Sequence, residues 1–358
     1  MGLKDTLKYY RGRRVIITGH TGFKGSWLSY LLDSIGAEIL GYSLAPNTEP
    51  SLFNSLYFSN KFNSIIGDIR DIQKLKETVQ SFKPEFIFHL AAQPLVIESC
   101  NNPKDTFDTN FTGTLNLLEI LRELDLSVQV VFITTDKVYE NLELGIPFVE
   151  NDKLGGKDPY SASKAASEIL IDSYNKTFFK DSHTNITVAR AGNVIGGGDW
   201  SVDRLIPDII KAKQQNKPLI IRSPKAIRPW QHVLEPLFGY LKLGVNLYKN
   251  PKEYSSVWNF GPEIDDSKTV AEIIDIGKKS GIIGEVIYED SKLVEAQSLK
   301  LNITKAKEKL NFKPVWNAQQ AIEITFDWYK SYYLDNLNTN YLMEKNLHSY
   351  INYKENFK

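Results

Sequence analysis

The chain of 358 residues has few of the side chains that build disulfide frameworks and zinc sites. It contains one cysteine, Cys100, and five histidines. A single cysteine excludes a disulfide-stapled secreted domain, and together with so few histidines it argues against a cysteine–histidine zinc centre. We therefore expect no metal site, and we expect the protein to work in a reducing compartment such as the cytoplasm.

An excess of charge is also missing, because 43 Lys and Arg residues balance 43 Asp and Glu residues. Without a global positive field, neither nucleic acid nor an anionic membrane is expected as a partner. No run approaches the roughly 20 apolar residues of a membrane helix. The length exceeds that of one typical domain, so we expect two domains or one enlarged α/β domain.

Three regularly spaced glycines follow a short β-branched run near the N-terminus. Residues 15–17 predict a strand, and Gly19, Gly22 and Gly25 come directly after it. Glycine suits a tight turn, a close approach of the backbone to a pyrophosphate, and the packing of a helix on its strand. The phosphates then bind the free N–H groups of that helix. This pattern predicts a dinucleotide site; the alternative is glycine used for packing alone.

Short β-rich runs then alternate with helical patterns, as in a Rossmann-type doubly wound parallel sheet of the α/β class. The other predicted strands are 38–44, 64–69, 85–90, 129–133 and 257–261. We divide the chain into a dinucleotide-binding domain, a smaller C-terminal α/β substrate-binding lobe, and a tail that packs outside or is mobile. These parts are residues 1–190 with 256–262 returning to the sheet, 191–330, and 331–358.

The end of the second predicted strand bears on the choice of cofactor. An acidic residue usually binds the adenosine ribose there, but this chain has Tyr42 and Ser43. No Arg or Lys lies between Lys24 and Lys61 either, so a 2′-phosphate has no evident partner. The sequence favours NAD over NADP.

A tyrosine and a lysine share one face of a helix predicted to open at Asp158. Tyr160 and Lys164 are four residues apart and follow a strand that ends in TTDKVY at 134–139. An ammonium and a positive nicotinamide ring stabilise a phenolate, so we expect the pKa of Tyr160 to fall from about 10 toward neutrality. Tyr160 could then act as a general acid or base. The alternative is a chance pair on an exposed helix.

Together these features resemble the extended short-chain dehydrogenase/reductase superfamily. More discriminating stretches are GHTGFKGSWL at 19–28, HLAAQPLV at 89–96, TTDKVYEN at 134–141, YSASKAASE at 160–168, RAGNVIGGGDW at 190–200 and RPWQHVLEPL at 228–237. Through them, roughly residues 11–330 resemble the CDP-glucose 4,6-dehydratase family.

The resemblance implies a redox-neutral lyase that uses NAD to convert CDP-D-glucose to CDP-4-dehydro-6-deoxy-D-glucose. Hydride leaves C4, water leaves across C5–C6, and the hydride returns at C6. Such a product is an early intermediate toward deoxy sugars of bacterial surface polysaccharide. Left open are a sugar-nucleotide 4-epimerase or decarboxylase, another 4,6-dehydratase, and a non-catalytic NAD-binding sensor.

The resemblance also assigns catalytic roles. Tyr160 matches the group that removes the O4 proton, Thr135 the hydroxyl that hydrogen-bonds O4, and Lys164 the group that orients the nicotinamide ribose. Asp136 matches the acid that protonates the departing 6-hydroxyl. The related dTDP-glucose dehydratases carry a glutamate as C5 base where this chain has Lys137. Either neutral Lys137 is the base, or it stabilises the enolate while another group takes the proton.

Cofactor contacts follow in the same way. The resemblance places Asp68 and Ile69 against the adenine, with helix capping by Asp68 or Asp71 as the alternative. Asn110 is expected to support a buried loop. The expected cofactor-binding set is Gly19, Thr21, Gly22, Phe23, Lys24, Gly25, Asp68, Ile69, Leu90, Ala91, Ala92, Thr109, Tyr160 and Lys164.

The C-terminal lobe is expected to bind the nucleotide sugar. Forked guanidinium groups suit a pyrophosphate, and a surface salt bridge is the alternative for Arg204. The expected substrate-binding set is Gln93, Asn193, Arg204, Arg222 and Arg228. Residues 196–200 are expected to form a mobile turn. The superfamily commonly pairs helices near 106–121 and 161–174 across a dimer, so we expect a homodimer or homotetramer.

Overall fold

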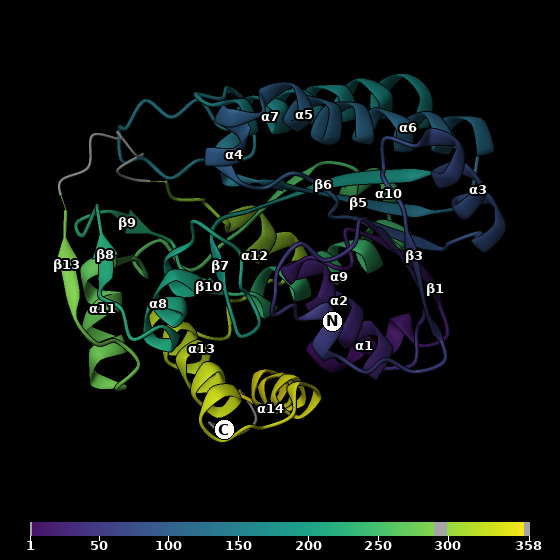
Figure 1. Cartoon of the computed structure of the whole chain (residues 1–358). Helices are drawn as coiled ribbons and strands as arrows, with labels where there is room; N and C mark the ends of the chain where they lie inside the picture. Colours follow the sequence, from purple (N-terminus) through teal and green to yellow (C-terminus); the bar gives the residue numbers. More distant parts are fainter. Residues whose placement is uncertain (1, 290–298, 354–358) are drawn as a thin grey trace.

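The computed structural model describes residues 2–289 and 299–353. Its centre is a parallel sheet with strand order β11-β6-β5-β4-β1-β2-β3 (Figure 1). The order reverses beside β1, which is where open α/β sheets bind their ligands. The strands are β1 Arg14–Thr18, β2 Glu38–Ser43, β3 Phe62–Ile66, β4 Phe86–His89, β5 Gln129–Thr135, β6 Asn185–Ala191 and β11 Val257–Phe260.

Helices cover both faces of this sheet (Figure 1). On β1, Val15 and Ile17 enter one hydrophobic core and Ile16 enters the other. Successive strand side chains point to opposite faces, so burial on both faces explains the continuous apolar runs. One layer contains α3 Ile72–Phe82, α4 Val96–Asn101, α5 Pro103–Phe107, η2 Asp108–Thr112, α6 Gly113–Leu124, α7 Pro159–Tyr174 and η4 Asn175–Phe179. The other contains α1 Leu3–Tyr10, α2 Phe23–Ser34 and α9 Leu234–Lys249.

The C-terminal lobe is built from short strand pairs and helices beside the carboxyl ends of the sheet. Its pairs are β7 Val194–Ile195 with β10 Gln231–His232, β9 Ile227–Arg228 with β12 Lys268–Thr269, and β8 Leu219–Ile221 with β13 Val286–Tyr288. Its helices include α8 Leu205–Gln214, α11 Val270–Lys279, α12 Thr304–Leu310 and α13 Ala318–Tyr333. The remaining short elements are η1 Phe53–Ser55, η3 Asp136–Val138 and α10 Pro251–Tyr254.

The α/β class and the doubly wound parallel sheet predicted from the sequence are confirmed. Differences of detail concern the third strand, which ends at Ile66 and not at residue 69, and the fifth, which continues through Thr135. The longer fifth strand follows from its burial, since all seven of its residues are buried. In the described part of the chain, no helix has the length and apolar character needed to span a membrane.

Up to residue 353, the tail after residue 331 packs against the rest of the protein, which is one of the two possibilities considered for it. α13 runs on to Tyr333, and a further helix, α14 Thr339–Asn352, packs beside it (Figure 1). α14 buries the side chains of Leu342, Met343 and Tyr350. Residues 354–358 of the expected tail lie outside the described residues.

Candidate active site

The turn after β1 has the close backbone contacts that a dinucleotide site requires. Gly19 has a φ of +75°, and a Cβ placed on it would lie 2.8 Å from the backbone nitrogen of Ala91. A Cβ on Gly25 would lie 2.0 Å from the Gly19 carbonyl oxygen. Gly22 is exposed, and a Cβ there would meet no atom closer than 3.4 Å. The turn is therefore tight on the sheet side and open above α2, where a pyrophosphate can reach free N–H groups.

Thr18 and His89 support this turn from below, and no role was predicted for either of them from the sequence. Thr18 Oγ1 lies 2.9 Å from His89 Nδ1 and accepts a hydrogen bond of 3.2 Å from Ala91 N. Burial lowers the pKa of His89 to about 3, so its ring is neutral at ordinary pH. The sequence feature that could have identified this contact is a polar residue at the end of each of two apolar strands, because buried polar groups need hydrogen-bond partners.

The end of β2 has uncharged hydroxyls where an acid is often found. Thr21 Oγ1 donates to Leu44 O at 2.8 Å and lies 2.9 Å from Ser43 Oγ. His20 lies nearby, and burial lowers its pKa to about 4. These neutral groups offer no cation for a 2′-phosphate, which agrees with the choice of NAD over NADP.

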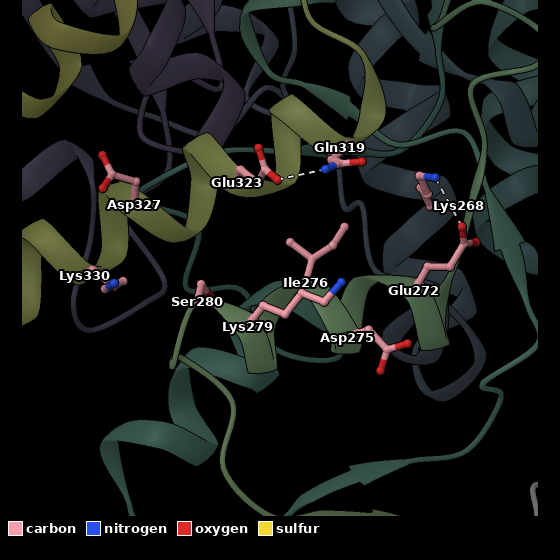
Figure 2. Close-up of a pocket in the computed structure, with 10 residues that line it drawn as sticks. All are labelled: Lys268, Glu272, Asp275, Ile276, Lys279, Ser280, Gln319, Glu323, Asp327 and Lys330. Atoms are coloured by element: carbon pink, nitrogen blue, oxygen red, sulfur yellow. Dashed lines mark hydrogen bonds and ion pairs between the residues drawn. The ribbon is translucent and has the colours of Figure 1, made fainter.

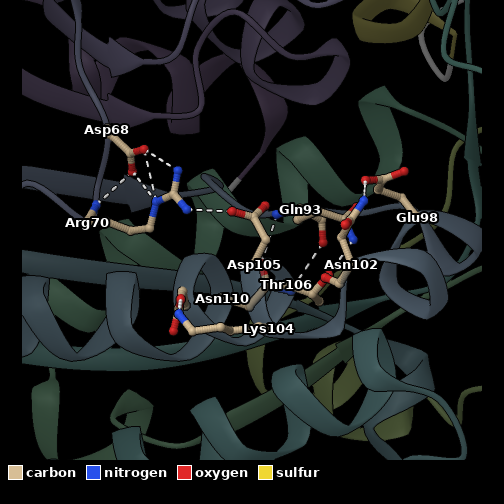
Figure 3. Close-up of polar contacts among 10 residues, drawn as sticks. Asp68, Arg70, Gln93, Glu98, Asn102, Lys104, Asp105, Thr106 and Asn110 are labelled. Carbon is tan, nitrogen blue, oxygen red and sulfur yellow. Dashed lines mark hydrogen bonds and ion pairs between the residues drawn. The ribbon is translucent and has the colours of Figure 1, made fainter.

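Asp68 is bound by an arginine two residues further on (Figure 3). Both carboxylate oxygens of Asp68 accept from Arg70, which also donates to Asp105 Oδ1 at 2.6 Å. The hydrogen bonds from Arg70 lower the pKa of Asp68. Asp71, and not Asp68, caps α3 by accepting from Lys74 N. Ile69 is buried against Gly113. The contacts of both predicted residues with adenine stay a prediction.

Gln93 is engaged by the protein itself (Figure 3). Its side-chain nitrogen donates to Leu95 O and Thr106 Oγ1, and its side-chain oxygen accepts from Leu95 N at 2.6 Å. Asn110 binds both backbone groups of Gln93, which is the loop-supporting role expected for it. These bonds fix the loop after β4; a substrate contact by Gln93 would have to replace one of them. The neighbours Leu90, Ala91, Ala92 and Thr109 are half-buried.

Thr135 and Asp136 lie at the carboxyl end of β5. The Thr135 hydroxyl donates to Asp136 Oδ1 at 3.0 Å and is hydrogen-bonded to Tyr160 of α7. Asp158 caps α7 by accepting from Ser161 N, so the helix begins one residue before Tyr160. Burial raises the pKa of Asp136, while Lys137 lowers it to a smaller extent. The predicted acid, hydroxyl and phenol therefore come together.

The sequence predicted a lowered pKa for Tyr160, but the protein's own groups raise it. Burial raises that pKa to about 12, and the neighbouring Thr135 hydroxyl lowers it only in part. Lys164 is itself buried, and burial lowers its pKa to about 8. Its Nζ donates to Ile133 O at 3.1 Å. Because desolvation opposes both charged forms, the four-residue spacing alone does not produce a phenolate.

Several cations surround Asp136. Lys137, Lys24 and Arg228 each lower its pKa, from η3, α2 and β9 respectively. Arg204 lies close enough to Tyr160 to lower the pKa of its hydroxyl. Arg204 also pairs with the buried Asp199 at 3.1 Å, so the salt bridge considered for it is present.

The remaining substrate candidates lie in two different settings. Asn193 is half-buried between β6 and β7, next to Gly192, where a Cβ would lie 3.0 Å from Asp136 Oδ2. Gly192 was missed in the sequence, although RAGN contains it. Arg222 is exposed and acts on the pKa of Asp208 in α8, and no contact joins it to Tyr160 or Asp136 in the described part of the chain.

The turn at residues 196–200 is packed, contrary to the mobile turn expected. Gly197 lies against Trp328 so closely that a Cβ would be 2.0 Å from the indole. Trp27 Nε1 donates to Gly197 O at 3.0 Å, and Tyr329 Oη donates to Asp199 O. Glycines serve close packing here, because helix α13 presses on the backbone.

A separate cavity of about 530 Å³ opens between α11 and α13 (Figure 2). Its lining of acids, lysines and amides is paired locally, as in Lys268–Glu272 at 3.2 Å and Gln319–Glu323 at 3.0 Å. It contains none of the predicted catalytic residues. We therefore assign the chemistry to the side chains gathered around Tyr160 and Asp136 at the carboxyl end of β5, and call this region the cleft.

Comparisons with known proteins identify the family to which the chain belongs. The profile of the family described as GDP-mannose 4,6 dehydratase matches residues 16–325. A CDP-glucose 4,6-dehydratase of Salmonella typhimurium is 43% identical over 333 residues, covering 90% of this chain and 92% of the relative. A UDP-glucose 4-epimerase of Mycoplasma pneumoniae is 27% identical, covering 89% and 97%.

Solved structures share the fold. The epimerase Mth375 of Methanothermobacter thermautotrophicus superposes with a TM-score of 0.81 at 24% identity, covering 96% of this chain and 97% of that one. DesIV of Streptomyces venezuelae, a dTDP-glucose 4,6-dehydratase solved with NAD and TYD bound, gives a TM-score of 0.77 at 22% identity, covering 89% and 97%. The resemblance seen in the sequence is confirmed, and the chain belongs to the GDP-mannose 4,6 dehydratase family.

Proposed function

We propose that the chain is an NAD-dependent CDP-glucose 4,6-dehydratase, a hydro-lyase that forms CDP-4-dehydro-6-deoxy-D-glucose. The observation that carries the proposal is the hydroxyl of Thr135, which connects the buried acid Asp136 to the half-buried phenol Tyr160. Oxidation at C4 needs a group on the O4 proton, and loss of water from C6 needs an acid. The 43% identity to a CDP-glucose 4,6-dehydratase supports the choice of sugar nucleotide.

Tyr160 and Thr135 handle the C4 hydroxyl. Tyr160 takes the O4 proton as general base, a role worth about 10²–10⁴-fold in rate, and because the product keeps the ketone at C4, this proton passes to solvent and does not return to O4. Its pKa of about 12 means that the free protein holds the phenol protonated at neutral pH. Positive charge brought by the cofactor's nicotinamide acts in the opposite direction to burial. Thr135 holds O4 in line with Tyr160.

Asp136 supplies the proton for the departing 6-hydroxyl. Burial favours its neutral form, which is the form that a general acid needs. Gly192 leaves room for the Asp136 carboxyl, since a Cβ on residue 192 would lie only 3.0 Å from Asp136 Oδ2. Lys137 is half-exposed beside Asp136, and we propose it as the group that takes the C5 proton.

NAD supplies the redox chemistry, accepting the C4 hydrogen and returning it at C6. We propose that the turn formed by Gly19, Gly22 and Gly25 holds its pyrophosphate and that Asp68 and Ile69 hold its adenine. Residues 1–190 with 256–262 then form the NAD-binding part, and residues 191–330 mainly bind the nucleotide sugar. Arg228 is the first candidate for the substrate pyrophosphate, because it also faces Asp136.

The test is to incubate the purified protein with NAD and, separately, CDP-, dTDP-, UDP- and GDP-hexoses, and to measure formation of a 4-keto product. We expect the highest kcat/KM with CDP-glucose and no accumulation of NADH. A C4 epimer without loss of water would support the 4-epimerase instead. Binding of NAD without turnover of any of these substrates would support the sensor.

We propose a homodimer formed through the layer of α5, α6 and α7. That layer exposes apolar side chains at Phe107, Ile169 and Phe178, with 37%, 61% and 47% of each accessible. Ile169→Glu should shift the sedimentation coefficient toward that of a monomer. We also place the protein in the cytoplasm, because its cysteine, Cys100, is free and exposed.

A further inference from the structure

Lys164 carries its charge in a setting that disfavours it. The side chain is buried, and the carbonyl of Ile133 is its hydrogen-bond partner among the residues that the structure describes. A carbonyl offers a partial charge only, so the ammonium loses hydration without gaining a full counter-charge by contact. Something nearby must oppose this effect if Lys164 is to bind the cofactor's ribose as a cation.

Glu168 lies one helical turn beyond Lys164. Tyr160, Lys164 and Glu168 are spaced by four residues along α7, which puts all three on one face. Glu168 is 3% exposed, so its charge acts through protein and not through water. It opposes the effect of burial on the pKa of Lys164. Buried opposite charges act strongly because water does not screen them.

Two neighbours fix the Glu168 carboxylate. Thr134 Oγ1 donates to Oε1 at 2.5 Å. Arg190 donates from Nε to both carboxylate oxygens, at 3.0 and 2.9 Å, and from Nη2 to Oε2. The third nitrogen of Arg190 donates away from the carboxylate, to Tyr139 Oη at 2.6 Å. The ion pair is thus a fixed dipole whose negative end belongs to α7, the helix of Lys164.

The other titratable groups facing Lys164 supply no negative charge. His89 of β4 is neutral, since burial lowers its pKa to about 3. Lys24 of α2 carries positive charge, and the positive charges of Lys24 and Lys164 repel each other. Tyr160 stays protonated in the free protein. Among these groups, Glu168 is therefore the one whose negative charge offsets the burial of the Lys164 ammonium.

We propose that Glu168 is a positioning residue: clamped by Arg190 and Thr134, it keeps Lys164 charged for its work in the cleft. The inference deepens the proposed function, since it concerns the same site. It does not depend on the identity of the sugar nucleotide, however, because the charge of Lys164 can be measured without substrate. Failure of one proposal is thus distinguishable from failure of the other.

The test is competitive acetylation of the cofactor-free protein with acetic anhydride over a series of pH values. Mass spectrometry of the peptide containing Lys164 reports its fraction of free amine and hence its pKa. In Glu168→Gln the pKa of Lys164 should fall by about one unit, the lower end of the effect of a nearby opposite charge. The loss of turnover at high pH should begin at a pH about one unit lower than in the wild type, because activity needs the charged form of Lys164.

Glu119→Gln is the matched control. Glu119 also accepts two hydrogen bonds from an arginine, Arg122, and one from a hydroxyl, that of Tyr174. It lies on α6 and does not act on the pKa of Lys164. Removing its charge should leave the titration of Lys164 unchanged.

Glu168→Gln leaves Arg190 buried without its partner and can unfold the protein. The double variant Glu168→Gln/Arg190→Met removes both charges, which is tolerated far better. It should still show a fall in the pKa of Lys164, smaller than in the single variant because the unpaired Arg190 cation is gone, and Glu168→Asp should keep the pKa of Lys164 closer to that of the wild type. If either folded variant lacking the carboxylate titrates as the wild type does, Glu168 is purely structural and the proposal is wrong.

Discussion

At the scale of single residues, the chemistry rests on the hydrogen-bonded sequence Tyr160, Thr135, Asp136. All three side chains are buried or nearly so, and burial opposes ionisation of both the phenol and the carboxyl. An unionised carboxyl is ready to donate a proton, whereas an unionised phenol is not ready to accept one. Burial thus shifts Asp136 toward the form that dehydration needs and shifts Tyr160 away from the form that oxidation needs.

Replacing Tyr160 by phenylalanine should remove the group on the O4 proton and little else. We expect turnover to fall by about 10²–10⁴-fold, with binding of NAD and CDP-glucose nearly unchanged in isothermal titration. Tyr57→Phe is the control, because Tyr57 is 77% exposed. Activity of Tyr160→Phe within a factor of about two of the wild type would remove Tyr160 from the mechanism.

The charge state of Tyr160 should depend on the cofactor. Phenolate absorbance of the wild type minus that of Tyr160→Phe isolates this one group. Without NAD, the difference should titrate near pH 12, since burial raises the pKa to about 12. With NAD, positive charge at the nicotinamide should move the titration to lower pH. A difference titration that is the same with and without NAD would show that the cofactor does not activate Tyr160.

Lys137 is where the chain departs from the related glutamate pattern. If it takes the C5 proton, Lys137→Met should leave C4 oxidation intact and stop elimination. A single turnover should then accumulate NADH and a 4-ketoglucose intermediate, while Lys137→Glu regains part of the elimination rate. Undiminished loss of water in quenched single turnovers of Lys137→Met would assign the C5 proton to another residue.

The spacing of residues in the sequence identified side chains that come together locally. It did not predict how burial changes their pKa values. Tyr160, Lys164 and Thr135 could be named because a helix face and a strand end fix where they lie. The rise in the pKa of Tyr160 depends on which distant segments cover it, and a sequence does not reveal that. Gly192 was missed for the same reason, since its contact with Asp136 joins β5 to the segment after β6.

At the scale of elements, α14 and α9 are tied by a buried acid. Glu235 of α9 accepts from the backbone nitrogens of Val315 and Trp316 at 2.8–3.1 Å, and Tyr350 of α14 donates to it at 2.7 Å. The carboxylate thus joins three segments far apart in the sequence. The sequence left open whether the tail packs outside or is mobile, because it is rich in Tyr, Asn and Lys and lies beyond the stretch that resembles the family.

Removing the Tyr350 hydroxyl should loosen this junction. Tyr350→Phe should lower the free energy of unfolding by about 1.5–3 kcal/mol, as for a hydrogen bond to a charged group. Urea denaturation measures the change, with turnover per folded molecule unchanged. Tyr341→Phe on the same helix should have no effect, because Tyr341 is 55% exposed. Equal stabilities of the two variants would mean that α14 contributes little to the core.

Strands were predicted well where burial on both faces makes them continuously apolar, as for β1 and β5. A mobile turn was expected at residues 196–200 because three consecutive glycines allow many backbone conformations. In the structure, Trp328 and Leu52 fill the space that side chains at these positions would need. Composition describes what a segment can do alone. Tertiary neighbours decide whether it moves.

At the scale of the whole molecule, the sheet with its helices and the C-terminal lobe both supply groups that act on Asp136 and Tyr160. Asp136 lies in η3, directly after β5, and Tyr160 lies in α7, while Arg228 lies in β9 and Arg204 directly precedes α8. Net charge is zero, so attraction of an anionic substrate depends on these local cations. The order of events in the cleft is the central claim.

Isotope transfer tests that claim most directly. CDP-glucose deuterated at C4, mixed with unlabelled substrate in ordinary water, should give product with deuterium at C6 of the same molecules that carried it. In deuterated water, solvent deuterium should enter at C5. Deuterium scrambled among product molecules, or recovered at C4 of an epimerised sugar, would contradict a 4,6-dehydratase.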